Sequence, residues 1–533
     1  MLTTILREEW GFDGLVMSDW GAVDERVPAL EAGLDLEMPS SGGVRDAEIV
    51  AAVEAGTLDP AVLDTAVDRL LTLARRTAAA REDPRPYDPA AHHRLAREAA
   101  AAGCVLLAND GTLPLAPSAG DRIAVIGEFA RTPRYQGAGS SLVTPTRLDA
   151  ALDALRSAVP DGVTVTFAPG FGLAEREDPA ADGPLRAGAV EAARTHDVVL
   201  LFLGLPAWAE TERVDRTHLD LPPAQLRLVE EVCAANPRTV VVLQNGSVVA
   251  TAGWSGRAAA VVEAWLGGQA GGAGVVDVLL GAVNPSGRLA ETVPLRLEDC
   301  PAHLGWPGEE GHVRYGEGVF VGDRHYDTVG RAVAFPFGHG LSYTTFGYAD
   351  LDVRMHGGGL RVAVRVTNTG TRRGREVVQV YAHRGRSRVA RPRRELVGFT
   401  DVVLDPGASA TAVVDVDGDD LAFWAARTRR WTVEGGPVEV LVGASSRDLR
   451  ASARVELPGD EERPALTDGA SLEEWLADPR GGPLLRGAID GLAGGPLTDP
   501  EMRRLLGSMP LRKVPLMGLG LDRDAVDRLL AGL

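Results

Sequence analysis

The sequence is short of several residue types, and each shortage excludes a class of protein. It has three cysteines in 533 residues, Cys104, Cys233 and Cys300, which are far apart in the chain and set in apolar surroundings. A disulfide framework or a cysteine-based metal site is therefore not expected, and we predict buried thiols. Lys513 is the only lysine, and aromatic residues make up 5% of the chain. No apolar run is long enough to cross a bilayer.

Positive charge is also scarce relative to negative charge. The 55 Lys and Arg residues face 74 Asp and Glu residues, which gives a formal net charge of -19. This charge repels nucleic acid and anionic membranes, so we expect neither as a partner. Residues 1–10 predict an amphipathic helix without the basic start and continuous apolar stretch of a secretory signal, which favours a cytoplasmic protein. The oligomeric state stays open, a homo-oligomer included.

The composition itself is that of a soluble globular protein, with 45% hydrophobic and 24% charged residues. Residues 14–21 (Gly-Leu-Val-Met-Ser-Asp-Trp-Gly) form a short apolar run that ends at Asp19. Such a run is typical of a buried parallel strand, and in α/β barrels the groups that do chemistry follow the ends of such strands. Asp19 could equally cap a helix predicted to begin near Val23. From these residues alone, both interpretations stand.

The length of the chain predicts several domains, and the apolar patterns change along it. Apolar strands predicted at residues 122–127, 198–203, 239–243 and 259–264 alternate with helices, which indicates a mostly parallel sheet between helices. Short alternating strands after residue 350 indicate an antiparallel β-sandwich. Residues 471–474 (Ser-Leu-Glu-Glu) form a capping box that starts a helix.

These patterns predict a multidomain protein of α/β and all-β parts. The expected domains are residues 1–81, a partial (β/α) barrel carrying Asp19; 82–89, a proline-rich linker; 90–349, an α/β sandwich; 350–457, a β-sandwich; and 458–533, a helical extension.

Many ordered motifs in roughly the first 455 residues resemble one known family. They are residues 5–14, 16–22, 32–39, 109–115, 136–141, 284–289, 315–318 and 335–343, followed in the β-sandwich by 366–370, 391–396 and 443–446. Together they resemble glycoside hydrolase family 3, the β-glucosidase family. The resemblance implies the C-terminal remnant of a TIM-like (β/α)8 barrel, an α/β sandwich and a fibronectin-III-like domain, before the short helical tail.

The resemblance also implies a catalytic pair. Asp19 matches the nucleophile of the family, and Trp20 would help to wall the sugar site. A retaining glycosidase needs a second carboxyl ~5–5.5 Å away that protonates the leaving oxygen. Residues 208–216 (Trp-Ala-Glu-Thr-Glu-Arg-Val-Asp-Arg) resemble the family pattern Glu-x-Glu-Gly-x-Asp-Arg, with Arg213 where glycine is usual. We expect Glu212 to be this acid, with Glu210 as second choice.

The chemistry sets a condition that this segment meets poorly. A general acid must be protonated near neutral pH, which requires a raised pKa, and a cation at Arg213 would lower the pKa of Glu212. Without the family resemblance, residues 208–216 would be interpreted as a solvated, ion-paired loop.

The function that the resemblance implies is a retaining β-glycosidase, with β-glucosidase as the best estimate, acting on terminal non-reducing β-D-glucosyl residues by double displacement. No cofactor or metal is expected, and the partner is a small carbohydrate or β-glycoside substrate. Full family members carry most of the barrel, with its sugar ligands, before the nucleophile strand, so we expect an N-terminally truncated chain. A non-catalytic remnant or carbohydrate-binding module is the alternative, and β-xylosidase and N-acetylglucosaminidase are alternative specificities.

Overall fold

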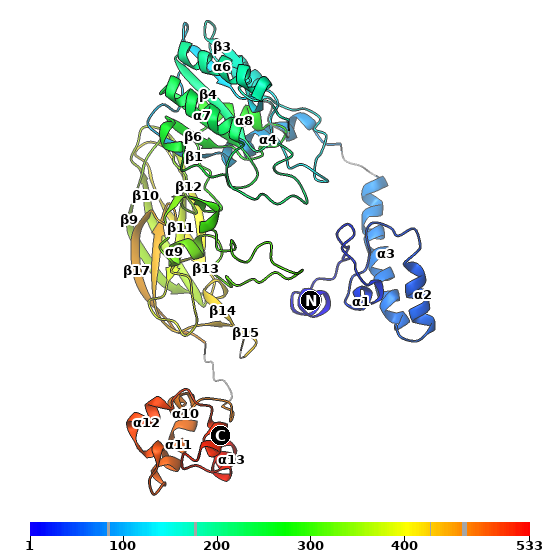
Figure 1. Cartoon of the computed structure of the whole chain (residues 1–533), viewed down its shortest axis with the longest axis vertical. Coiled ribbons are helices and arrows are strands. Elements are labelled where there is room, and N and C mark those ends of the chain that lie inside the picture. Colours follow the sequence, from blue (N-terminus) through cyan, green and yellow to red (C-terminus); the bar gives the residue numbers. More distant parts are fainter. Residues whose placement is uncertain (83–85, 175–178, 427, 461–465) are drawn as a thin grey trace. The chain divides into compact units, whose positions relative to one another are not determined.

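The computed structural model describes residues 1–82, 86–174, 179–426, 428–460 and 466–533. The chain divides into two compact units, Met1–His92 and His93–Leu533 (Figure 1). The expected linker at residues 82–89 lies partly outside the described residues.

The first unit is mostly helical. Its helices are the π-helix η1 (Leu2–Glu9) and the α-helices α1 (Arg26–Glu31), α2 (Asp46–Glu54) and α3 (Pro60–Glu82). Its small core consists of Leu30, Ile49, Leu58 and Ala66. The sequence predicts a buried parallel strand that ends at Asp19, but the described residues of this unit hold only one parallel bridge, between Met17 and Leu36. A single strand pair without neighbours does not extend into a ladder.

The second unit begins with a six-stranded, mostly parallel sheet, as the sequence predicts. Its strands are β1 (Val105–Asn109), β2 (Arg122–Ile126), β3 (Thr164–Ala168), β4 (Val198–Gly204), β5 (Thr239–Gln244) and β6 (Ala260–Glu263). Their order is β1-β6-β5-β4-β2-β3, and β1 alone runs antiparallel to its neighbour. Every residue of β4 and β5 is buried. Their continuous apolar sequences follow from helical cover on both faces.

Helices pack in pairs on this sheet (Figure 1). They are α4 (Pro89–Gly103), α5 (Ala151–Ala158), α6 (Pro179–Thr195), α7 (Pro223–Ala235) and α8 (Gly271–Leu279), with the short turn η2 (Glu128–Ala130) after β2. Helix α5 contacts α8, and α6 contacts α7. The chain passes from β2 through α5 to the edge strand β3, then returns through α6 to β4 on the other side of β2. Open α/β sheets bind ligands beyond the carboxyl ends of their strands, at such a reversal of strand order.

Short elements connect the α/β sandwich to the following layer. They are β7 (Val293–Pro294), η4 (Leu297–Asp299), α9 (Asp323–Thr328) and β8 (Val333–Phe335), with β7 and β8 paired antiparallel. The turn η3 (Ser255–Arg257) lies within the sandwich, between β5 and β6.

An antiparallel β-sandwich follows, as expected. Its strands are β9 (Phe346–His356), β10 (Gly359–Asn368), β11 (Gly374–His383), β12 (Glu395–Leu404), β13 (Ser409–Val416), β16 (Gly436–Gly443) and β17 (Leu449–Leu457), with η5 (Asp419–Leu421) and the hairpin β14 (Ala422–Ala425) and β15 (Arg430–Val433). One sheet has the order β13-β10-β9 and the other β12-β11-β16-β17. Valines and leucines of both sheets form the core between them.

The last segment is helical, as predicted. It contains α10 (Leu472–Ala477), α11 (Gly481–Asp490), η6 (Pro496–Thr498), α12 (Pro500–Leu505), η7 (Leu511–Lys513), η8 (Pro515–Met517) and α13 (Arg523–Ala531). The capping box is confirmed: Glu474 N donates to Ser471 Oγ (3.2 Å), and Ser471 N donates to Glu474 Oε2 (2.7 Å). This helical tail has its own core around the fully buried Trp475. Lys513 lies exposed on η7.

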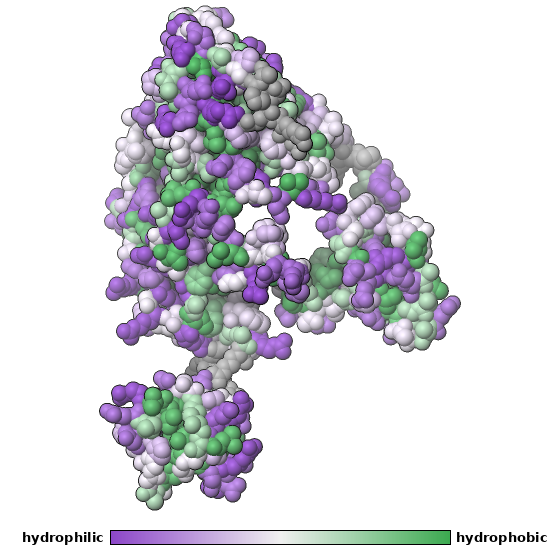
Figure 2. All heavy atoms as spheres, viewed as in Figure 1, coloured by the Kyte–Doolittle hydropathy of each residue, from purple (hydrophilic) through white to green (hydrophobic). Residues whose placement is uncertain are grey.

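The surface mixes polar and apolar residues, and two of the three cysteines are buried. Figure 2 shows hydrophilic and hydrophobic residues interspersed over the visible face. Cys104 and Cys233 are buried, as predicted, and burial raises the pKa of their thiols to about 12 and about 11; Cys300 is partly exposed. In the described part of the chain, no helix combines the length and apolar character needed to cross a membrane.

Candidate active site

Asp19 follows the short paired segment of the first unit, and its side chain is exposed. Two backbone hydrogen bonds hold this segment: Ser18 N donates to Leu36 O (2.9 Å), and Leu36 N donates to Val16 O (3.1 Å). The Asp19 carboxylate accepts from the backbone N–H of Trp20 (2.6 Å) and makes no ion pair within the described residues. It is therefore a fixed, solvent-facing acid.

The other acid of this segment, Asp35, has a structural environment. Its side chain is 1% exposed and pairs with Arg7 (2.7 Å) and Arg69 (2.9 Å). It also accepts a hydrogen bond from Val16 N (2.8 Å). Asp35 thus holds the segment in place, while Asp19 is left free to meet a ligand.

The interpretation of Asp19 as a helix cap is wrong. Helix α1 begins at Arg26, and Glu25 occupies its N-cap position. Trp20, predicted to wall the sugar site, is 66% exposed beside Asp19.

Glu212 lies on the loop that follows β4, in the second unit, and its side chain is exposed. Its Oε2 accepts hydrogen bonds from the hydroxyl and from the backbone N–H of Ser140, the latter at 2.9 Å. These two donors and the charge of Arg213 favour the ionised carboxylate, so they lower the pKa of Glu212. In this conformation the ionised form of Glu212 is therefore favoured.

Arg213, the residue that departs from the family pattern, has an unusual backbone. Its φ is 69°, in the left-handed region that favours glycine. A glycine would adopt this backbone conformation without strain, whereas this chain adopts it with an arginine.

Glu210 lies two residues before Glu212 but has a different environment. Its carboxylate accepts from the backbone N–H of Gly246 (2.8 and 3.0 Å to its two oxygens) and from the hydroxyl of Ser247 (2.8 Å). The guanidinium of Arg134 lies 3.7 Å from Glu210 Oε2, and both side chains are mostly buried. Glu210 is therefore tied to the loop after β5, whereas Glu212 is exposed.

Arginines fasten both ends of the loop that carries Glu212. Arg134 Nε donates to Leu205 O (2.8 Å), where the loop begins. Arg216 Nη2 donates to Ser247 Oγ (3.0 Å) and to Val248 O (2.7 Å), just beyond Glu212. The expected alternative of an ion-paired, solvated loop thus describes only part of this segment, because its anchors are buried or half-buried.

A third acid, Glu263, ends strand β6 at the same edge of the sheet. It is 4% exposed, and burial raises its pKa to about 8. Trp265 N (2.9 Å) and Asn245 Nδ2 (3.2 Å) donate to its two oxygens. Glu291 and Glu210 add like charge, which raises the pKa of Glu263 further. This edge of the sheet therefore carries a carboxyl that is mostly protonated at neutral pH.

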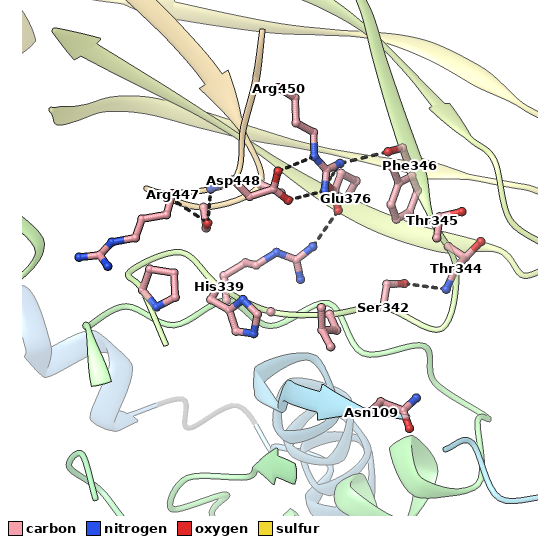
Figure 3. A pocket seen from close by; sticks show the side chains of 16 residues that line it. Asn109, His339, Ser342, Thr344, Thr345, Phe346, Glu376, Arg447, Asp448 and Arg450 are labelled. Atoms are coloured by element: carbon pink, nitrogen blue, oxygen red, sulfur yellow. Dashed lines mark hydrogen bonds and ion pairs between the residues drawn. The ribbon is translucent and has the colours of Figure 1, made fainter. Parts of the chain in front are cut away.

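A cavity of about 640 Å³ lies elsewhere, where the α/β sandwich meets the β-sandwich (Figure 3). The charged side chains that line it pair with one another. Glu376 accepts a hydrogen bond from Arg288 Nη2 (2.8 Å) and lies 3.5 Å from Arg450 Nη1. Arg450 also pairs with Asp448 (2.7 Å). None of the four predicted site residues lines this cavity. We assign it to the junction between layers.

His339 has a structural environment at the junction between the two layers. His339 lines the junction cavity, its Nε2 lies 2.9 Å from Leu107 O, and its ring stacks on Phe335. Burial lowers the pKa of His339. Over the described ranges, no cluster of three or more His, Cys, Asp or Glu side chains is arranged to hold a metal ion.

Of the side chains that hold the predicted acids, only Ser140 lies in a motif noted in the sequence, residues 136–141. Ser140, Arg134 and Ser247 come from segments far from Glu212 in the chain, and the glycines around Ser140 were the one signal, since glycine marks a close backbone approach. The structure thus brings Glu210 and Glu212 together on one loop of the second unit and places Asp19 with Trp20 in the first.

Comparison with known proteins defines the class. Residues 1–73 match the model of the glycosyl hydrolase family 3 N-terminal domain, residues 104–343 that of the family 3 C-terminal domain, and residues 376–446 that of a fibronectin type III-like domain. The chain is thus a glycoside hydrolase, built from an α/β part and an all-β part.

Similar proteins agree with these matches. The chain is 46% identical to an exo-α-(1->6)-L-arabinopyranosidase of Bifidobacterium longum, over 98% of this chain and 70% of that protein. It is 43% identical to the thermostable β-glucosidase B of Acetivibrio thermocellus, over 92% of this chain and 66% of that protein. The crystal structure of a β-glucosidase from Bifidobacterium adolescentis superposes with a TM-score of 0.85 at 47% identity, covering 91% of this chain and 70% of that one. The chain belongs to glycoside hydrolase family 3.

Proposed function

We propose that the protein is a retaining exo-β-glycosidase in which Asp19 is the nucleophile and Glu212 the acid/base. The observation that carries this proposal is that both carboxylates are exposed, each following a strand segment at its carboxyl end. The nearby acids Asp35 and Glu210 are instead mostly buried against the arginines Arg7 and Arg134. Family membership supplies the reaction class.

In the first step, a carboxylate oxygen of Asp19 attacks the anomeric carbon. Glu212 gives its proton to the glycosidic oxygen as the bond to the leaving alcohol breaks, and a glycosyl ester of Asp19 forms. In the second step, Glu212 takes a proton from water, and the resulting hydroxide attacks the anomeric carbon and frees Asp19. Each residue ends the cycle in its starting form.

The two steps make opposite demands on Glu212. The hydrogen bonds from Ser140 and the charge of Arg213 favour the ionised form of Glu212, which suits the second step. Protonation for the first step requires a higher pKa, and both desolvation by a bound sugar and the negative charge of a nearby Asp19 act in that direction.

We propose β-D-glucosides as the preferred substrates, since β-glucosidases recur among the relatives. The arabinopyranosidase relative supports a second candidate, α-L-arabinopyranosides. α-L-Arabinopyranose has the ring configuration of β-D-galactopyranose without C6, so its leaving group is equatorial, as in a β-D-glucoside. The same nucleophile and acid therefore serve both sugars, and contacts at C4 and C6 decide between them.

The test combines turnover with trapping of the covalent intermediate. The full chain is assayed on nitrophenyl β-D-glucoside, β-D-xyloside, α-L-arabinopyranoside and N-acetyl-β-D-glucosaminide. It is then incubated with a 2-deoxy-2-fluoro glycoside that carries a dinitrophenyl leaving group, digested, and analysed by mass spectrometry. We expect turnover of the glucoside and a fluorosugar on the peptide that contains Asp19.

Variants assign the two roles. Asp19→Ala should abolish turnover, while Asp13→Asn, which changes an exposed acid of the same unit, should leave it intact. Glu212→Ala should lower kcat/KM by ~10²–10⁴-fold on nitrophenyl substrates but spare kcat/KM on dinitrophenyl substrates, whose leaving group needs no acid. The kcat on dinitrophenyl substrates should fall, because the second step lacks its base, and should recover with azide, which needs none. A folded chain that turns over none of the four glycosides would contradict the proposal and favour the binding-module alternative. A label on another residue would contradict the role of Asp19 as nucleophile.

A further inference from the structure

The motif at residues 136–141 (Gln-Gly-Ala-Gly-Ser-Ser) lies directly against the loop that carries Glu212. We infer that Ser140 and Glu210 are positioning residues for Glu212, one acting at its carboxylate and the other at the base of its loop. This inference rests on the proposed role of Glu212 as acid/base.

Ser140 acts on the carboxylate itself. Its backbone N–H (2.9 Å) and its hydroxyl both donate to the same oxygen, Oε2 of Glu212. The two segments also pair through a parallel bridge between Ala138 and Thr211. Two donors on one oxygen fix the plane of the carboxyl group and leave Oε1 as the oxygen able to carry a proton toward a ligand.

Gly139 makes this approach possible. Its φ is 92°, and a Cβ at this position would lie 2.7 Å from Glu212 Cβ and 3.0 Å from Glu212 Oε2. A side chain at Gly139 would therefore push the acid away. The glycine explains why the motif can touch the loop so closely.

Glu210 acts at the base of the loop. Its bonds to Gly246 N and Ser247 Oγ attach the loop after β4 to the loop after β5, and Arg134 covers it on another side. Ser247 Oγ also accepts from Arg216 Nη2, so the residues before and after Glu212 share one anchor. Only the stretch 211–215 is left between these fixed points.

These contacts to Glu212 and its loop matter because the Glu212 side chain is exposed and makes no ion pair in the described residues of its unit. An exposed glutamate samples several rotamers, and a misplacement of about 1 Å can cost ~10²-fold in rate. The contacts of Ser140 and Glu210 select one position. Catalytic groups need this support from neighbours whose own conformations are fixed.

The first experiment separates positioning from general structure by its pH dependence. Arg213 is the charged group that acts on Glu212, and Ser140 supplies the neutral donors. In Ser140→Ala the hydroxyl donor is lost, so we expect the alkaline limb of kcat/KM to move up by about 0.5–1 pH unit. We also expect kcat on a nitrophenyl glucoside to fall about tenfold with little change in KM.

The control for this experiment is Ser141→Ala. The Ser141 hydroxyl reaches only Gly137 O, at 3.5 Å, and does not touch Glu212. Its pH profile should match that of the wild type. An unshifted alkaline limb in Ser140→Ala, with unchanged kcat, would overturn the role of Ser140.

The second experiment needs no activity. Arg213 is exposed in the middle of the loop, so trypsin can cleave after it when the loop opens. In Glu210→Gln the charge and one acceptor are lost, and we expect cleavage after Arg213 to become about tenfold faster, measured by mass spectrometry. Glu231→Gln, which removes an acid from a surface ion pair of the same sandwich, should not change it.

The two experiments test the positioning roles separately from the proposed glycosidase activity. Faster cleavage in Glu210→Gln supports the anchor even if the wild-type chain turns over no glycoside. Unchanged cleavage, with unchanged kcat in an active enzyme, would overturn the role of Glu210. Azide should rescue Glu212→Ala but neither Ser140→Ala nor Glu210→Gln, because the positioning variants keep their acid.

Discussion

At the scale of single residues, neighbours two positions apart in the sequence have opposite roles. Glu210 and Glu212 are the same residue type on the same loop, but one accepts from Gly246 and Ser247 and the other from Ser140 at the surface. Arg213 beside them keeps a left-handed backbone without being glycine. The chemical character of this loop is therefore set by tertiary partners and by one strained residue.

Arg213→Gly should change both stability and pH dependence. Relief of the left-handed strain gains roughly 1–2 kcal/mol, and the entropy of glycine costs about 0.5–1 kcal/mol, so the net gain is below about 1.5 kcal/mol. Loss of the cation raises the pKa of Glu212, so the alkaline limb of kcat/KM should move to higher pH. Thermal denaturation and a pH–rate profile measure the two effects.

Arg213→Ala serves as the matched control. It removes the charge but retains the side chain at a positive φ, so it should shift the alkaline limb without raising the melting temperature. If neither variant shifts the limb, the charge of Arg213 does not act on the acid.

At the scale of elements, the acids Glu210, Glu212 and Glu263 all lie at or beyond the carboxyl edge of the parallel sheet. The loops after β4 and β5 are bound to each other through Glu210, and β6 ends in the buried Glu263. Because the strands run in the same direction, residues remote in the sequence arrive at one edge. Burial at this edge raises the pKa of Glu263, so the stability of the folded chain depends on pH through this carboxyl group.

Glu263 should make the folded state less stable as the pH rises. Burial raises its pKa from 4.5 to about 8, so between these values the folded chain binds a proton that the unfolded chain has released. Stability from this group is therefore full below pH ~4.5 and is lost progressively up to pH ~8, by a few kcal/mol. Glu263→Gln, which stays neutral, should lose this decline.

The measurement compares melting temperatures of the wild type and Glu263→Gln at pH 5 and pH 8.5. The difference between the two proteins isolates this carboxyl from all other titrating groups. Glu230→Gln, a change at a surface ion pair with Arg257, provides the control. Equal pH slopes for wild type and Glu263→Gln would show that Glu263 ionises normally.

Much of this architecture could be predicted from the sequence, and the rest depends on contacts that sequence patterns do not encode. Strands β2, β4, β5 and β6 follow from uninterrupted apolar runs, because burial on both faces demands them. The edge strand β3 holds no fully buried residue, so its pattern is weaker. The choice between Glu210 and Glu212 depends on Gly246 and Ser140, which approach only in the folded chain.

At the scale of the whole molecule, the α/β sandwich and the β-sandwich are joined by buried charges. Glu376, on β11, is 2% exposed and accepts from Arg288 of the α/β part and from the hydroxyl of Tyr348 (2.9 Å) on β9. Figure 3 shows Glu376 beside Arg450 and Asp448 in the wall of the junction cavity. Fixed charges of this kind define one relative arrangement of the two layers within the second unit.

Glu376→Ala should destabilise the second unit by about 3–5 kcal/mol, because it leaves the buried guanidinium of Arg288 without its carboxylate. We expect calorimetry to show a lower melting temperature and a separation of the transitions of the two layers. Asp415→Asn, at the exposed pair with Arg361 (2.7 Å), should cost below about 1 kcal/mol. Equal effects of the two substitutions would contradict a role for burial.

The position of the single lysine has a practical consequence. Lys513 lies exposed on η7 of the helical tail, so its side-chain amine is the one target in the sequence, apart from the terminal amine, for amine-directed conjugation. A fluorophore or a surface tether attached there leaves Asp19, Glu212 and the anchors of its loop chemically untouched. The protein can thus be immobilised through a segment that carries none of the proposed chemistry.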